Sequence, residues 1–207
     1  MTTAIIDSGG ANISSVVHAL RRLGEEPVFT ADAATIRSAE RVILPGVGAA
    51  GAAMSHLRER DLIGTIQALT QPVLGICLGM QLLFEHASED DVECLCIIPG
   101  RIEKMCVAPG VRIPHMGWNT TEKCADDPLL EQLPERPWFY FVHSYHAAVD
   151  QNTLASCHHG LQFAAIVRKD NFYGVQFHPE RSAGHGARLL ANFLASDQSG
   201  SFKINTC

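Results

Sequence analysis

The chain has 207 residues, which suits a single folded domain, and we expect that domain to span residues 1–196 with a flexible tail at 197–207. Its formal net charge is -6 and its Lys and Arg residues are scattered, which argues against partners such as nucleic acid or a membrane surface. The N-terminal segment does not resemble an export signal, no run of ~20 apolar residues occurs, and the seven cysteines are an odd number, so we expect a cytoplasmic protein with reduced thiols.

The first half of the chain alternates strand and helix patterns. Short apolar runs predict strands at 3–7, 26–30, 41–45 and 72–76. Helical patterns follow at about 12–23 and from the loop after residue 48 through residue 69, whereas 31–40 is a short polar segment. Strands that alternate with helices form a mostly parallel sheet that is covered on both faces.

The second half of the chain changes character. Between Val92 and Phe177, short apolar runs are interrupted by Pro, Gly and Asn, a pattern that predicts antiparallel strands, strands that return to the sheet, and long loops. An amphipathic segment at 187–195 predicts a closing helix. The chain as a whole therefore predicts an α/β fold with an open, mostly parallel central sheet, helices on both faces and an antiparallel extension.

The stretch VLGICLGMQLLFEH at 73–86 places Cys77 between Gly75 and Gly79, where a strand pattern turns into a helical one. This is the spacing of a nucleophile elbow with Cys in place of Ser, because small flanking residues allow a sharp turn that presents the reactive atom above the sheet edge. A helix that begins behind the sulfur favours the thiolate, the form that attacks carbonyl carbons. Cys77 is thus a candidate nucleophile, and the alternative is an inert packing cysteine.

The sequence GVQFHPERS at 174–182 supplies a candidate base, His178, and a candidate orienting group, Glu180. We expect a strand that ends at His178, because Pro179 has no N–H to donate. In an extended chain, residues two apart project to the same side, about 6.5 Å apart. The carboxylate can then orient the imidazole, which takes the thiol proton and passes it to a leaving amine.

The positions of Cys77 and His178 after predicted strands indicate that the two residues can form one site. Cys77 and His178 both follow strands, and the carboxyl ends of parallel strands meet at one edge of an open sheet, so the two can converge although they are far apart in sequence. The alternative for the second motif is a solvated His-Pro-Glu turn.

Other motifs indicate no further site. The turn DSGGANISS at 7–15 lacks the G-x-G-x-x-G spacing of a dinucleotide-binding loop, so we expect a tight turn with Asn12 or Ser14 capping the next helix. The C-x-C at 94–96 and the CHH at 157–159 lack the spacing of a zinc site. We expect no metal and no cofactor.

Three motifs together resemble the class I, triad-type glutamine amidotransferases: GICLGMQ at 75–81, FVHSY at 141–145 and GVQFHPE at 174–180. The resemblance covers residues 4–195. It implies that Cys77 attacks the side-chain amide of glutamine and forms a thioester that water hydrolyses, with His178 as base and then acid and Glu180 as its orienting partner. Arg181 stands where Lys is common in the family, which keeps the charge.

The resemblance also implies the residues around the triad. Two backbone N–H groups are needed for the oxyanion, and they are expected at Leu78 and in the PGVG loop at Val47 or Gly48, where the glycines let the Val47 peptide reorient. Glutamine-binding residues are expected at Gly46, Gln81, Ser144 and Tyr145. Gln81 lies one helical turn after Cys77 and therefore on the same side.

Within this class, LPGVGAAGAAM at 44–54 and PHMGWN at 114–119 are similar to the glutaminase subunits of imidazole glycerol phosphate synthases, which act in histidine biosynthesis. The AAG after Gly48 stands where the family commonly has an aromatic residue. This resemblance implies a (β/α)8 cyclase partner that receives ammonia through a tunnel. PHMGWN would lie at that interface, and the alternative is a Pro/Gly turn that buries Trp118.

Two other functions stay open at this level. One is a different enzyme of the same fold, such as the glutaminase of pyridoxal phosphate synthesis or a free-standing cysteine hydrolase. The other is a catalytically silent binding module. The PGVG and PHMGWN motifs argue against the first, and the complete set of Cys, His and Glu argues against the second.

Overall fold

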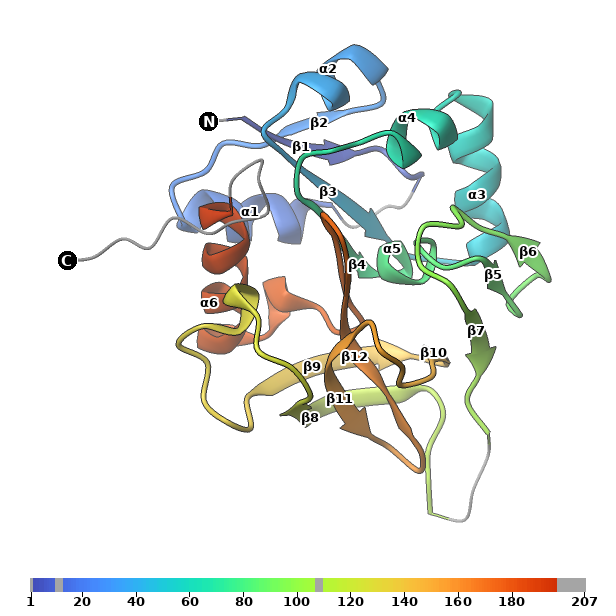
Figure 1. Cartoon of the computed structure of the whole chain (residues 1–207), viewed down its shortest axis with the longest axis vertical. Coiled ribbons are helices and arrows are strands. Elements are labelled where there is room, and N and C mark those ends of the chain that lie inside the picture. The colour runs from blue at the N-terminus through green and yellow to red at the C-terminus, as the bar shows by residue number, and fades with distance from the viewer. Residues whose placement is uncertain (1, 10–12, 107–109, 197–207) are drawn as a thin grey trace.

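The computed structural model describes residues 2–9, 13–106 and 110–196. Among these residues, nine strands form one sheet in the order β2-β1-β3-β4-β13-β12-β11-β8-β9 (Figure 1). The parallel part consists of β2 (Val28–Thr30), β1 (Thr3–Ile6), β3 (Arg41–Gly46), β4 (Val73–Cys77) and β13 (Phe172–Val175). The antiparallel extension consists of β12 (Gln162–Lys169), β11 (Thr153–His158), β8 (His115–Lys123) and β9 (Trp138–His143). This confirms the predicted fold class.

Helices cover both faces of the parallel part, as Figure 1 shows. On one face lie α1 (Ser14–Arg22) and α6 (Ala183–Ala195), and on the other lie α2 (Ala33–Ser38), α3 (Ala50–Glu59) and α4 (Ile63–Gln67). Successive side chains of a strand point to opposite faces. Ile5 and Ile43 therefore belong to the core under α1 and α6, whereas Ala4 and Val42 belong to the core under the other helices.

The described chain also contains a small sheet beside the parallel part, with strand order β10-β7-β5-β6. Its members are β10 (Tyr145–Ala147), β7 (Arg101–Lys104), β5 (His86–Ala87) and β6 (Val92–Glu93). β10 follows β9 after a single residue, Ser144, so the chain leaves the large sheet at that point. The 143–145 segment is thereby held between the two sheets.

Several local predictions were wrong. The polar segment 31–40 contains α2, which begins where the Asp32 carboxylate accepts a hydrogen bond from the N–H of Thr35. The long helix expected up to residue 69 is divided into α3 and α4, because Asp61 between them adopts a left-handed φ of 57°. The N-cap position of α1 is Ile13, whose side chain makes no capping hydrogen bond, and Ser14 is already the first residue of the helix. Asn12 lies outside the described residues.

Other boundaries also moved. The helix after Cys77 is the four-residue α5 (Leu78–Gln81), after which the chain turns rather than continuing through Phe84. The closing helix begins at Ala183, four residues earlier than expected. The strands β8 and β11 extend through segments for which the sequence analysis named no strand. The predicted tail at 197–207 lies outside the described residues. In the described part, no helix combines the length and the apolar character needed to cross a bilayer.

Candidate active site

The turn at the end of β4 presents Cys77 in a conformation that few non-glycine residues adopt, with φ 54° and ψ -110°. Both flanking glycines are required by close packing of α5 on the sheet. A Cβ on Gly79 would lie 1.8 Å from the carbonyl oxygen of Leu44, and a Cβ on Gly75 would lie 2.6 Å from that of Gly79. The sequence spacing of the elbow thus corresponds to a sharp, tightly packed turn.

The chain brings His178 to Cys77 through the parallel pairing of β13 with β4. Gly174 is in register with Gly75, and Val175 with Ile76, so the two strands end side by side. β13 ends at Val175 and not at His178 as predicted, because the N–H of His178 bonds to the carbonyl of Tyr140 on β9 at 2.9 Å. The segment that carries the imidazole therefore crosses from β13 towards β9.

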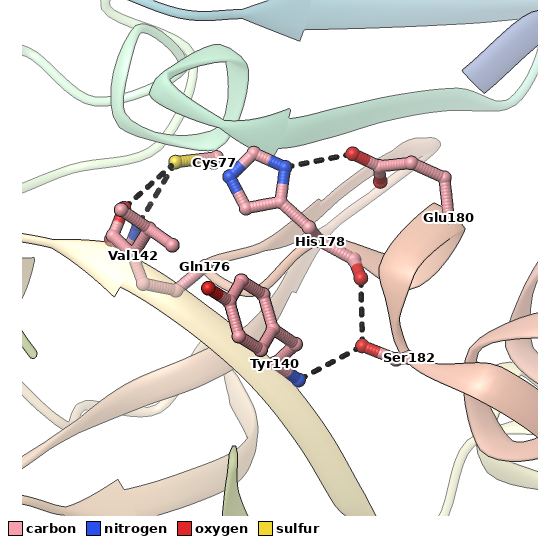
Figure 2. A network of polar contacts seen from close by, with 7 residues as sticks. All are labelled: Cys77, Tyr140, Val142, Gln176, His178, Glu180 and Ser182. Carbon is pink, nitrogen blue, oxygen red and sulfur yellow. Dashed lines mark hydrogen bonds and ion pairs between the residues drawn. The ribbon is translucent and has the colours of Figure 1, made fainter. Parts of the chain in front are cut away.

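His178 and Glu180 are in direct contact, with 2.8 Å between Nδ1 and Oε1. Glu180 reaches this position from a short 3-10 turn, η2 (Pro179–Arg181), rather than from the extended chain that we expected. Ser182 fixes the backbone: its hydroxyl accepts from the N–H of Tyr140 and donates to the carbonyl of His178. Figure 2 shows Cys77 and Glu180 on opposite sides of the imidazole ring, an arrangement in which one nitrogen faces each of them.

The electrostatics of this row favour a charged imidazole. Burial lowers the pKa of His178, but hydrogen bonds to Cys77 and Glu180 and the charges of both partners outweigh burial and raise the pKa of His178 to about 10. His178 therefore holds a proton at neutral pH before any substrate arrives. An imidazolium beside a sulfur is equipped to stabilise a thiolate and to protonate a leaving amine.

A cavity of about 300 Å³ opens in front of Cys77. It brings together nine residues that the sequence analysis named: Gly46, Val47, Gly48, Cys77, Leu78, Gln81, Ser144, Tyr145 and His178. Glu180 is not part of its wall, because it lies behind the imidazole (Figure 2). The cavity also has lining residues that the sequence analysis did not name as site residues: Glu89, Pro114, Val142 and His143.

Comparisons with known proteins agree with this geometry. The family model for class I glutamine amidotransferases matches residues 4–196. The chain belongs to this family. Two solved structures have the same fold at low sequence identity. They are a putative GMP synthase protein of Thermoplasma acidophilum (TM-score 0.73, 18% identity, 94% of this chain and 92% of that one) and PurLQS of Thermotoga maritima (TM-score 0.68, 19% identity, 93% and 97%).

Much closer relatives of this amidotransferase are found by sequence. It is 55% identical over 191 residues to the imidazole glycerol phosphate synthase subunit HisH of Xanthomonas axonopodis pv. citri, a match that covers 92% of this chain and 96% of that protein. It is 52% identical over 194 residues to the protein of the same name in Xylella fastidiosa, covering 94% and 97%. Each of these matches spans nearly the whole length of both aligned proteins.

The PGVG loop of the amidotransferase borders the cavity through Gly46, Val47 and Gly48. Gly46 is in register with Cys77, and a Cβ there would lie 2.6 Å from the backbone nitrogen of Gly79. Gly48 has a φ of 95°, in the left-handed region that side chains disfavour. The backbone conformation at Gly48 therefore depends on its being a glycine.

Gln81 and Glu89 are two of the polar residues that line the cavity besides Cys77 and His178. The amide nitrogen of Gln81 donates to the carbonyl of Tyr145 at 3.2 Å and to Oε1 of Gln176 at 2.9 Å, so the oxygen of Gln81 is left for a substrate. Glu89 accepts from the N–H of Ala50, the first residue of α3, at 3.0 Å. Burial raises the pKa of Glu89 from its ordinary value, and the Ala50 hydrogen bond partly offsets it.

Sequence reasoning missed Glu89 and Gln176 for different reasons. Glu89 lies in a loop with no motif spacing, and only folding carries it to the cavity. Gln176 lies two residues before His178, and residues two apart in an extended chain share a side. That alternation was a signal for Gln176, whose amide lies 3.8 Å from the sulfur of Cys77.

The other cysteines of the described residues are buried in the core or exposed at the surface. Burial raises the pKa of Cys94 to about 11 and that of Cys157 to about 12, so both stay protonated at neutral pH. Among the described residues, no group of three or more His, Cys, Asp or Glu side chains is arranged to hold a metal ion.

The structure of the PHMGWN segment contradicts one of the two interpretations offered for it, a Pro/Gly turn that buries Trp118. The segment instead forms the start of β8 and leaves Met116 64% exposed and Trp118 49% exposed. Trp138 on β9, which is opposite Thr120 and therefore diagonal to Trp118, is also exposed. Pro114, just before β8, lines the cavity. Met116, Trp118 and Trp138 therefore form an exposed apolar patch on two strands that reach the candidate active site: β8 begins just after Pro114, and β9 ends with Val142 and His143, which line the cavity.

Proposed function

We propose that this amidotransferase is the glutaminase subunit of imidazole glycerol phosphate synthase, a cytoplasmic enzyme of histidine biosynthesis. It hydrolyses glutamine to glutamate and ammonia and passes the ammonia to a (β/α)8 cyclase subunit. The observation that carries the proposal is the row formed by Cys77, His178 and Glu180, in which Cys77 and His178 line the cavity and Glu180 lies behind the imidazole. The 55% identity to HisH of Xanthomonas axonopodis supports the pathway.

The row of Cys77, His178 and Glu180 can carry out the hydrolysis in two stages, formation and hydrolysis of a thioester. The Cys77 thiolate attacks the side-chain amide carbon of glutamine, while backbone N–H groups at Leu78 and in the PGVG loop stabilise the oxyanion. The C–N bond breaks as His178 gives its proton to the nitrogen, and ammonia leaves. The neutral imidazole then takes a proton from water, whose oxygen attacks the thioester. Glutamate leaves, and the thiolate and imidazolium are restored.

Glu89 suits the α-ammonium group of glutamine. Its carboxylate lines the cavity, and the Ala50 N–H bonds only one of its oxygens among the contacts seen here. A hydrogen bond between two charged groups is stronger than a neutral one and gives orientation as well as affinity. The Gln81 oxygen and the 144–145 segment are then available for the remaining polar groups of the amino acid.

Glu89→Gln is expected to raise the KM for glutamine about 10- to 100-fold, the range for loss of one hydrogen bond to a charged group, with a smaller change in kcat. The amide still accepts from Ala50, so the start of α3 is preserved. The matched control is Asp90→Asn, since Asp90 accepts from the N–H of Gly51 in the same way but does not line the cavity. Steady-state glutamate release checks both variants, and an unchanged KM in Glu89→Gln would remove this residue from substrate binding.

The proposal as a whole is tested by glutamate release from the chain alone, with the cyclase subunit, and with the cyclase and its nucleotide substrate. We expect a stepwise rise, because the PGVG peptide has more than one orientation open to it and a bound partner can favour the productive one. Loss of one oxyanion donor costs about 10²–10³ in rate, which sets the scale of the rise.

A substitution in the apolar patch tests whether the cyclase binds there. Trp118→Ala is expected to weaken stimulation by the cyclase, because a large exposed aromatic side chain is the usual centre of such an interface. Phe29→Ala, on the edge strand β2, changes an equally exposed aromatic residue and is expected to keep full stimulation. Glutaminase activity that no cyclase binds or stimulates would instead assign the chain to another amidotransferase.

A further inference from the structure

We infer that Gln176 is a further catalytic residue of this glutaminase: its amide N–H donates to the sulfur of Cys77 and stabilises the thiolate, in an orientation imposed by Gln81. The inference rests on the proposed function, in which Cys77 is the nucleophile. Gln176 Nε2 lies 3.8 Å from Cys77 Sγ, and the Gln176 side chain is fully buried (Figure 2). A donor to sulfur at this distance is of value only if the amide cannot turn its oxygen towards the thiolate.

The orientation of the Gln176 amide follows from a carbonyl oxygen, which can only accept. Gln81 lies 3.2 Å from the carbonyl of Tyr145, so the group that it directs there must be its NH₂. The same NH₂ lies 2.9 Å from Gln176, which must therefore present its oxygen to Gln81. The NH₂ of Gln176 is left to face the sulfur of Cys77. The opposite orientation would place two NH₂ groups against each other and an oxygen against the thiolate.

The Tyr145 carbonyl is also bonded to a buried histidine, His143, which is in turn bonded to a second one, His115. His143 donates to the carbonyl through Nδ1 at 2.8 Å, so Nε2 of His143 is an acceptor, and Nδ1 of His115 donates to that nitrogen at 3.0 Å. The Asn119 amide lies 3.3 Å from Nε2 of His115 and completes the chain. Burial is the main cause that lowers the pKa of His115 to about 3 and of His143 to about 4, so both rings are neutral at pH 7.

The surroundings of the sulfur explain why it needs this donor. The carbonyl oxygen of Val142 lies 3.7 Å from Sγ and can accept from a thiol S–H, but it offers nothing to a thiolate. When the proton is on His178, the Gln176 N–H is a second donor that favours the negative sulfur. The side chain is buried, so water does not compete for this hydrogen bond, and a bond to a charged group is stronger than a neutral one. The same donor serves the sulfur again when it leaves the thioester.

The test is the reactivity of Cys77 towards iodoacetamide in the isolated chain at pH 7, read by mass spectrometry of the peptide that carries Cys77. Gln176→Met replaces the amide by an apolar side chain of similar length. We expect alkylation to fall about tenfold or more, with a similar fall in kcat for glutamate release. Gln81→Met is expected to give a smaller fall in alkylation, because it frees the Gln176 amide to rotate. Alkylation needs no glutamine, so it separates this role at the sulfur from substrate contact.

The matched control is Gln71→Met. Gln71 is also buried and donates to a backbone carbonyl, that of Ile36, but it lies before the start of β4, at the opposite end from Cys77. Unchanged alkylation in Gln176→Met, or an equal fall in Gln71→Met, would overturn the inference. Gln176→Leu decides the question if the Met variant does not fold. Glutamate release by Cys77→Ala would instead overturn the proposed function, so the two failures are distinguishable.

Discussion

Replacement of Cys77 by Ala is expected to abolish glutamate release, whereas the cyclase partner should still form its product when ammonia is supplied in solution. This is the largest effect that we expect, because the substitution removes the atom that forms the thioester. Loss of the nucleophile costs about 10⁶ in kcat in a hydrolase with a comparable triad. The other described cysteines do not line the cavity, and burial keeps Cys94 and Cys157 as thiols.

The measurement is glutamate formation, followed beside ammonia-dependent cyclisation by the assembled complex. Cys157→Ala is the matched control, since it removes a buried sulfur from the core without touching the cavity. We expect that variant to keep glutaminase activity. Glutamate formation at the normal rate by Cys77→Ala would assign the chemistry to another thiol, and loss of the ammonia-dependent reaction would show a folding or assembly defect.

The second large effect concerns His178 and Glu180. His178→Asn removes the group that carries the proton in both steps and is expected to lower kcat by about 10⁶, close to the loss of the nucleophile itself. Glu180→Gln leaves an imidazole that is present but poorly oriented, and a loss of about 10⁴ is expected. Glu103→Gln is the control, because Glu103 is exposed and forms a surface ion pair with Arg101.

Glu180→Gln should also change the pH dependence of the reaction. The pKa of His178 is raised to about 10, so the wild-type rate is maintained at neutral pH and falls only as pH rises through that value and the imidazolium loses its proton. Removal of the Glu180 hydrogen bond and charge lowers the pKa of His178. The alkaline limb of the kcat/KM profile is therefore expected to move to lower pH. Equal, small losses in both variants, with no movement of the limb, would remove the pair from the mechanism.

Local features of the sequence determined much of the fold and the centre of the site. Four strands of the parallel part, β1 to β4, lie in the apolar runs of the first half of the chain, and their alternation with helices was sufficient to predict a mostly parallel sheet. The fifth, β13, comes from the second half, and the alternation did not predict its place beside β4. Gly75 and Gly79 allow one tight turn at Cys77, and their separation is a local property. His178 and Glu180 are two residues apart, so their contact is possible in more than one backbone conformation. The prediction of that contact agreed with the structure although the predicted extended conformation was wrong.

Only the tertiary structure decided which distant groups meet. No local sequence pattern marks Glu89 as a site residue. It reaches the cavity because the loop that carries it packs against the first turn of α3, where Glu89 accepts from the N–H of Ala50. Gln176 could be placed on the side of His178, but its role depends on Gln81 and on the carbonyl of Tyr145. Trp118 was equally compatible with burial and exposure, and it is exposed because no described segment covers that face of β8. Periodicity determines the side on which a residue lies, whereas packing of remote segments determines its partners, its burial and therefore its charge state.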